Sequence, residues 1–115
     1  MPVLTEGKHT AEFLLSEGNG TISRDEVVIS STAGALVPGT VMGKVAASGE
    51  YVAYSNAAVD GSEVAVAILY AAVADLAVDQ KAVVITRDAE VMTAELTGLD
   101  APGIADLAAK GIVCR

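Results

Sequence analysis

The chain alternates short apolar segments with turn-forming residues, and this pattern predicts a series of β-strands. Glycine-containing turn signals, such as Gly18-Asn19-Gly20 and Asp60-Gly61, separate segments that are rich in β-branched residues. One segment opens with Pro38-Gly39, an order that suits a type II turn. The segments expected to form strands are 12–17, 26–30, 36–45, 50–54, 63–70, 82–86, 89–93 and 112–114.

The middle of the chain carries three more detailed expectations. Segment 63–70 is apolar at nearly every position, which favours a central strand covered on both faces. In the following segment, 71–80, Ala and Leu leave a helical interpretation open. Segments 82–86 and 89–93 flank Arg87-Asp88 and are expected to pair as a hairpin.

A short helix is predicted near the C-terminus. Asp100 can cap the helix, Pro102 fits its first turn, and Gly111 ends it. The apolar positions with helical spacing are Ile104, Leu107 and Ala108. The whole pattern therefore predicts a mainly β protein, built of short strands with a short C-terminal helix.

The N-terminal residues differ from the rest because they are polar and show no periodicity. Ordering a residue costs about 1–2 kcal/mol, and residues 1–11 offer few apolar groups to offset that cost. We therefore expect residues 1–15 to form a flexible arm and residues 16–115 to form a single β-rich domain.

Composition and charge narrow the function classes. The formal net charge is −8 and no run of basic residues occurs, which argues against direct binding of nucleic acid. The apolar run Val64–Ala74 is too short to span a membrane. Aromatic residues make up only 3% of the chain, so the large apolar walls of a typical small-molecule pocket are lacking.

No group of residues has the composition or spacing of a catalytic or metal site. His9 is the only histidine and has no second ligand at a suitable spacing, and Cys114 is the only cysteine. The carboxylate pairs Asp75/Asp79 and Glu90/Glu95 lie in no calcium-binding pattern. We therefore expect no catalytic, cofactor-binding or metal-ligating residues, and a protein that is not an enzyme.

Three segments carry a resemblance to a known family. They are Glu12–Asp25, with the sequence EFLLSEGNGTISRD, Leu36–Val45, with LVPGTVMGKV, and Asp60-Gly61 followed by AVAIL at 65–69. In this order they resemble the bacteriophage head decoration proteins of the lambda protein D type, over about residues 10–115. The first segment is the most specific of the three.

The resemblance implies a small, antiparallel, β-clip-like fold without catalytic residues. It also implies homotrimers that bind the major capsid protein on the outer surface of the expanded head, at three-fold and quasi-three-fold sites, and stabilise the shell. The protein would then be found in the virion, and in the host cytoplasm during assembly. The arm is the part expected to bind the capsid, as an added strand, through Thr10, Glu12, Phe13, Leu14 and Leu15. Phe13 and Leu15 would present one face of that strand.

An alternative is a β-clip or small-barrel domain that serves as an enzyme subunit or a carbohydrate-binding module. Such a module needs a cluster of polar and aromatic residues, for which Tyr51 and Tyr54 are the candidates. They are three positions apart, so on a flat strand they should face opposite sides. This spacing favours the decoration protein.

Overall fold

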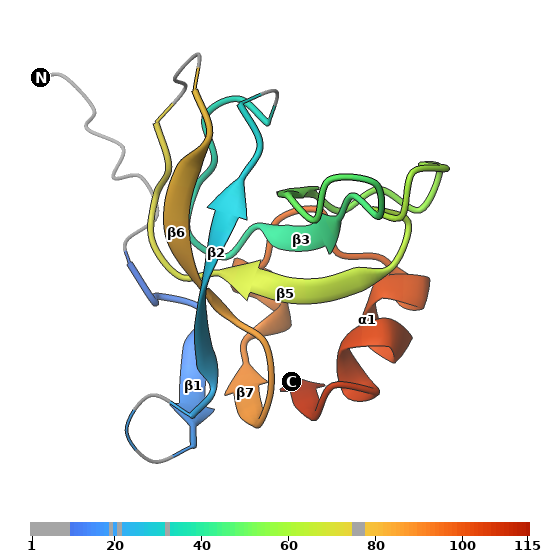
Figure 1. Ribbon diagram of the computed structural model, residues 1–115. Coiled ribbons are helices and arrows are strands. Elements are labelled where there is room, and N and C mark those ends of the chain that lie inside the picture. Colours follow the sequence, from blue (N-terminus) through green and yellow to red (C-terminus); the bar gives the residue numbers. More distant parts are fainter. Residues whose placement is uncertain (1–9, 19, 21, 32, 75–77) are drawn as a thin grey trace, which may run out of the picture.

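The protein combines a closed five-stranded barrel, a separate three-stranded sheet and one short helix (Figure 1). The computed structural model describes residues 10–18, 20, 22–31, 33–74 and 78–115. The strands are β1 (Leu14–Glu17), β2 (Arg24–Ile29), β3 (Val41–Lys44), β4 (Tyr51–Ala53), β5 (Ala65–Leu69), β6 (Gln80–Ile85), β7 (Ala89–Val91) and β8 (Ile112–Cys114). The helices are the 3₁₀ turn Thr93–Glu95 and α1 (Ala101–Ala108).

The barrel has the strand order β2-β4-β3-β5-β6 and closes through β2. Strand β2 pairs along its whole length with β6, from Arg24 opposite Ile85 to Ile29 opposite Gln80. On its other side it meets β4 in parallel, where Ile29 lies opposite Tyr51. Closure leaves the barrel without free edges.

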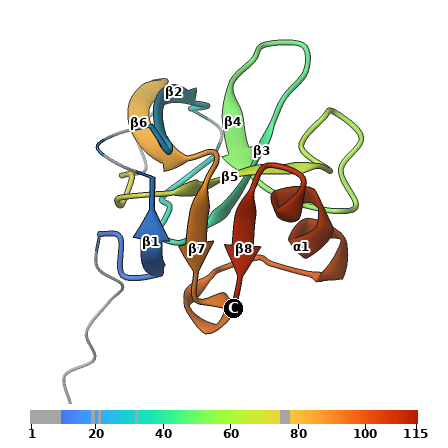
Figure 2. The ribbon, with the colours of Figure 1, turned by 90° about the horizontal axis from the view of Figure 1, so that it is seen from below.

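The second sheet has the order β1-β7-β8 and lies beside the barrel (Figure 2). Strand β7 pairs antiparallel with β1 and parallel with β8, so that Leu14 and Cys114 both lie opposite Val91. Helix α1 packs against β5 and β8. The first and last strands of the described chain therefore share one central strand.

Two apolar clusters form the core, one on each face of the barrel wall. The cluster inside the barrel contains Ile29, Leu36, Met42, Ala67, Leu69, Val73 and Val84. The cluster between the barrel, the second sheet and α1 contains Phe13, Val41, Tyr54, Ala65, Ile68, Ile85, Ala89, Val91, Leu107 and Ile112. Strand β5 contributes to both clusters, which confirms the prediction of a central strand covered on both faces.

The predicted secondary structure is largely confirmed. The protein is mainly β, with strands in all the expected segments and one short C-terminal helix. Most strand pairs are antiparallel, as expected, whereas β2–β4 and β7–β8 are parallel. Pro38-Gly39 does form a turn, in which Gly39 has a φ of 88° and the Thr40 N–H donates to the Val37 carbonyl at 3.2 Å.

Helix α1 has the predicted start but a narrower apolar face. The Asp100 side chain caps it by accepting a 2.8 Å hydrogen bond from the Gly103 N–H. Leu107 is fully buried, while Ile104 is exposed. The second buried position is Gly103, where a Cβ would lie 3.1 Å from Cε2 of Tyr54. The helix approaches the core closely because Gly103 has no side chain.

One prediction for the segments after β5 is wrong, and one alternative left open there is not found in the described residues. Segments 82–86 and 89–93 form no hairpin, because β6 pairs with β2 and β5 whereas β7 pairs with β1 and β8. The chain crosses between the sheets at Asp88, which has a φ of 49°. No helix occurs in the described part of 71–80, where Val73 forms a bridge with Leu36 and β6 starts at Gln80. Tertiary pairing overrides the helix propensity of Ala and Leu there.

The described contacts of the fold begin before residue 15, where the end of the arm was expected. Residues 1–9, most of the expected arm, lie outside the described residues. The Ala11 N–H donates to the Tyr70 carbonyl at 2.9 Å, and Phe13 is only 1% exposed. The boundary expected at residue 15 therefore falls inside β1, because the largest apolar side chain of this segment fills the core.

Candidate interaction surfaces

The five residues predicted to bind a partner lie at the start of the folded domain, but they do not share one face. Thr10 and Glu12 are exposed, Leu14 is half-buried and Leu15 is 48% exposed, while Phe13 points into the core. The expectation that Phe13 and Leu15 present one face is wrong, because the register of β1 shifts between Leu14 and Ser16. This β-bulge separates the two side chains.

The outer face of the second sheet is the surface next to these residues. Ser16, Glu90 and Val113 lie side by side across β1, β7 and β8. Val113 is 45% exposed. Glu90 forms an ion pair with Arg115, in which Nε of Arg115 lies 3.0 Å from Oε2 of Glu90. An open hollow of about 280 Å³ runs over this face. We call Thr10, Glu12, Leu14, Leu15 and Val113 together the amino-terminal surface.

Within the described ranges, no strand pairs with the outer edge of β1. Strand β1 pairs with β7 on one side only, and it is the edge strand of the sheet furthest from α1 (Figure 2). At the opposite edge, α1 packs against β8. An edge strand presents unpaired backbone groups, to which another chain can add a strand.

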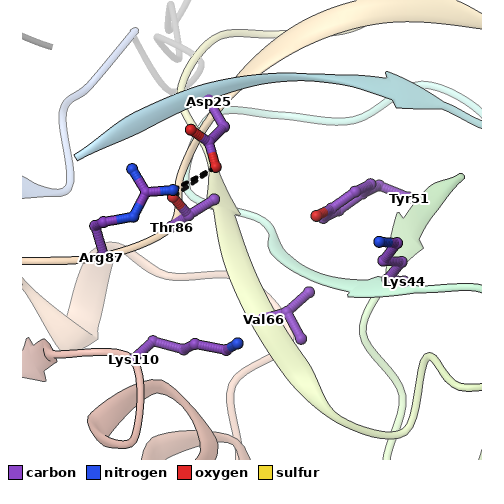
Figure 3. A pocket seen from close by; sticks show the side chains of 7 residues that line it. All are labelled: Asp25, Lys44, Tyr51, Val66, Thr86, Arg87 and Lys110. Atoms are coloured by element: carbon purple, nitrogen blue, oxygen red, sulfur yellow. Dashed lines mark hydrogen bonds and ion pairs between the residues drawn. The ribbon is translucent and has the colours of Figure 1, made fainter. Parts of the chain in front are cut away.

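A second surface feature is a pocket lined by residues of four barrel strands and of the segments that follow β6 and α1 (Figure 3). Its volume is about 280 Å³. The lining residues are Asp25, Lys44, Tyr51, Val66, Thr86, Arg87 and Lys110. Asp25 to Val66 come from β2, β3, β4 and β5, Thr86 and Arg87 directly follow β6, and Lys110 follows α1.

One wall of this pocket is a fixed ion pair. Arg87 donates to Oδ2 of Asp25 at 2.6 Å, and the Thr86 hydroxyl donates to the same oxygen at 3.1 Å. Arg87 also donates to the Ile22 carbonyl. Tyr51 also lines the pocket. Burial raises the pKa of the Tyr51 hydroxyl, and the negative charge of Asp25 raises it further. Tyr51 is therefore a neutral hydrogen-bonding group at pH 7.

Tyr51 and Tyr54 lie on opposite sides of the barrel wall, as their spacing predicts. Tyr51 packs against the cluster inside the barrel, while Tyr54 belongs to the cluster outside it. The Tyr54 hydroxyl donates to Oδ1 of Asp100 at 2.7 Å. Burial and this contact with Asp100 raise the pKa of Tyr54 to about 12. The two tyrosines form no joint aromatic surface.

The other titratable residues considered in the sequence have structural surroundings where they are described. His9 and Asp75 lie outside the described residues. Asp79 accepts from the Ser31 N–H at 2.8 Å, and a hydrogen bond with Glu50 lowers the pKa of Asp79 and raises that of Glu50. Among the residues that the structure describes, no three His, Cys, Asp or Glu side chains gather as metal ligands would. Burial raises the pKa of the Cys114 thiol.

The architecture defines a class, a small protein built on a closed five-stranded barrel with a second three-stranded sheet. The comparisons with known proteins identify the family. The family model for bacteriophage lambda head decoration protein D matches residues 3–112, so the chain belongs to that family, as the sequence segments predicted. This membership supports a role in decoration of the phage capsid.

One further comparison and one structural finding bear on the chain. No curated protein matches it. Across the described ranges, no helix has the length and hydrophobicity needed to cross a membrane.

Proposed function

We propose that the protein binds the outer surface of the expanded phage head as homotrimers, at three-fold and quasi-three-fold sites, and stabilises the shell. Its partner is the major capsid protein. The observation that carries this proposal is the family match over residues 3–112. A decoration protein acts by binding, so we also propose that it works without catalysis.

We further propose that the amino-terminal surface makes the capsid contact. It combines exposed apolar groups, Leu15 and Val113, with an unpaired strand edge at β1. A strand added at that edge would gain backbone hydrogen bonds, and Leu15 would supply apolar contact area beside it. Phe13 supports this contact indirectly, because its burial holds β1 in place.

Co-sedimentation with expanded and unexpanded heads tests the proposal. The protein should pellet with expanded heads, reach a stoichiometry that is a multiple of three per site, and raise the temperature at which the heads lose their DNA. Occupancy of two-fold positions in electron microscopy images of decorated heads would contradict the trimer.

The surface is tested by Leu15→Glu, with Val59→Glu as the matched control. Both residues are exposed apolar side chains, with Val59 at 96%, but Val59 lies in the loop between β4 and β5. We expect Leu15→Glu to weaken capsid binding at least about tenfold, or about 1.4 kcal/mol, and Val59→Glu to bind normally. Equal loss in both variants would place the capsid contact elsewhere.

A further inference from the structure

The pocket in the barrel wall is distinguished by the cations that line it. Of the 7 Lys and Arg residues, Lys8 lies outside the described residues. Four others form ion pairs: Arg24 with Glu17, Lys81 with Glu26, Arg87 with Asp25 and Arg115 with Glu90. The two described cations that remain, Lys44 and Lys110, both line this pocket.

Both lysines are exposed and form no ion pair with the described residues. The chain has 15 carboxylate side chains and a net charge of −8, so partners for lysine are plentiful. Lys44 comes from the end of β3 and Lys110 from the turn after α1, 66 positions away in the sequence. Two positive charges that line one pocket repel each other. An anion bound between them would attract both and so offset that repulsion.

The geometry of the pocket adds hydrogen-bond donors to the two charges. In Figure 3 the Lys110 ammonium group points towards Val66, and the Tyr51 hydroxyl and Lys44 lie on the other side of Val66, where they line the same pocket. Asp25, the only carboxylate in the lining, is neutralised by Arg87 at 2.6 Å. The uncompensated charge of the pocket is therefore that of the two lysines.

We propose that this pocket binds a phosphate group. A phosphate carries a charge of about −1.5 to −2 at pH 7, which matches two ammonium groups, whereas a carboxylate would leave one of them uncompensated. Its oxygens point in several directions, so that the lysines and the Tyr51 hydroxyl that line the pocket are suitable donors to them. The ligand is either inorganic phosphate or a small phosphate monoester. This proposal goes beyond the decoration of the capsid and concerns the free protein.

The test is a titration of the full chain with inorganic phosphate at constant ionic strength, followed by amide chemical shifts in NMR spectra. Constant ionic strength matters because salt alone screens surface charges. We expect saturable, one-site shifts centred on Lys44, Tyr51, Val66 and Lys110. Parallel titrations with glycerol phosphate and with acetate identify the ligand chemistry. Comparable binding of glycerol phosphate indicates a monoester, and binding of inorganic phosphate alone indicates the free ion.

Three variants assign the binding to the pocket. Lys44→Gln and Lys110→Gln should each weaken phosphate binding about tenfold, and the double variant should abolish it. Lys81→Gln removes the same charge from β6, outside the pocket, and should change the affinity less than twofold. The proposal is overturned if Lys81→Gln weakens binding as much as Lys110→Gln, if shifts fail to saturate, or if acetate binds as tightly as phosphate.

Discussion

The carbonyl oxygen of Phe13 accepts a 2.8 Å hydrogen bond from the backbone N–H of Met92, which places the start of the folded chain against the end of β7. The next residue, Thr93, donates to the carbonyl of Arg115 at 3.0 Å. Both ends of the described chain are thus fastened to neighbouring residues. The Phe13 ring is buried in the cluster between the barrel and the second sheet, so apolar packing as well as hydrogen bonding holds the start of the folded chain in place.

We predict that Phe13→Ala destabilises the fold by about 3–5 kcal/mol, because it removes a fully buried aromatic side chain and leaves a cavity. The control is Leu15→Ala two residues away, where the side chain is 48% exposed and the cost should be within about 1 kcal/mol. Urea unfolding followed by circular dichroism measures both. Similar, small losses in the two variants would mean that Phe13 is not part of the core.

These findings also indicate what the sequence could and could not predict. Strand segments, the Pro38-Gly39 turn and the Asp100 cap follow from local chemistry, and all are found. The pairing of β6 and β7 with different sheets depends on long-range contacts. The Ser23 hydroxyl, for example, donates to the Asp88 carbonyl from 65 positions away. No local pattern around Arg87-Asp88 signals that contact.

The candidate sites were likewise predictable from the sequence only in part. Leu15 could be recognised as an exposed apolar residue, but Phe13 is buried while Leu15 is exposed, and the register shift in β1 that accompanies this difference is not visible in the sequence. The pocket was not predicted at all, because Lys44 and Lys110 are far apart in the sequence and neither belongs to a motif. The remaining signal, a lysine at the end of one strand, is too common to be informative.

The turn at Gly39 offers a test of backbone geometry, because Gly39 and Gly98 both have positive φ, 88° and 84°. A Cβ on Gly39 would lie 2.7 Å from the Glu95 carbonyl oxygen, whereas a Cβ on Gly98 would meet nothing within 4 Å. We expect Gly98→Ala to cost about 1–2 kcal/mol from φ alone. Gly39→Ala should cost at least about 1 kcal/mol more, because of the added clash. Equal melting temperatures for the two variants would contradict this view of the turn.

Tyr54 should make stability depend on pH in the alkaline range. Its pKa in the folded protein is about 12, above the ordinary value of 10.0 for a tyrosine, so the folded state favours the neutral phenol. The neutral phenol of Tyr54 therefore contributes its full stabilisation of the fold below pH 10. This contribution is lost as the pH rises from 10 towards 12. Tyr54→Phe lacks the 2.7 Å bond to Asp100 and should be about 1 kcal/mol less stable at pH 8.

The measurement is the free energy of unfolding of both proteins at several pH values from 8 to about 11.5. The advantage of the wild type over Tyr54→Phe should shrink steadily above pH 10. Tyr51, whose pKa is also raised, is present in both proteins and cancels in the difference. A difference that stays constant across this range would mean that Tyr54 does not titrate with a raised pKa.

Two N-terminal truncations separate folding from capsid binding. Residues 2–9 offer few apolar side chains, so deleting them should change the free energy of unfolding by less than about 0.5 kcal/mol. Deleting residues 2–15 removes Phe13 and half of β1, and should destabilise the fold by at least the cost of Phe13→Ala, about 3–5 kcal/mol. The shorter deletion therefore isolates any contribution of residues 2–9 to the proposed capsid contact. If these residues order on the head, co-sedimentation with expanded heads should weaken about tenfold or more while the fold stays intact. Unchanged capsid affinity in that truncated protein would confine the contact to residues 10 onwards, with Leu15 and the β1 edge as its centre.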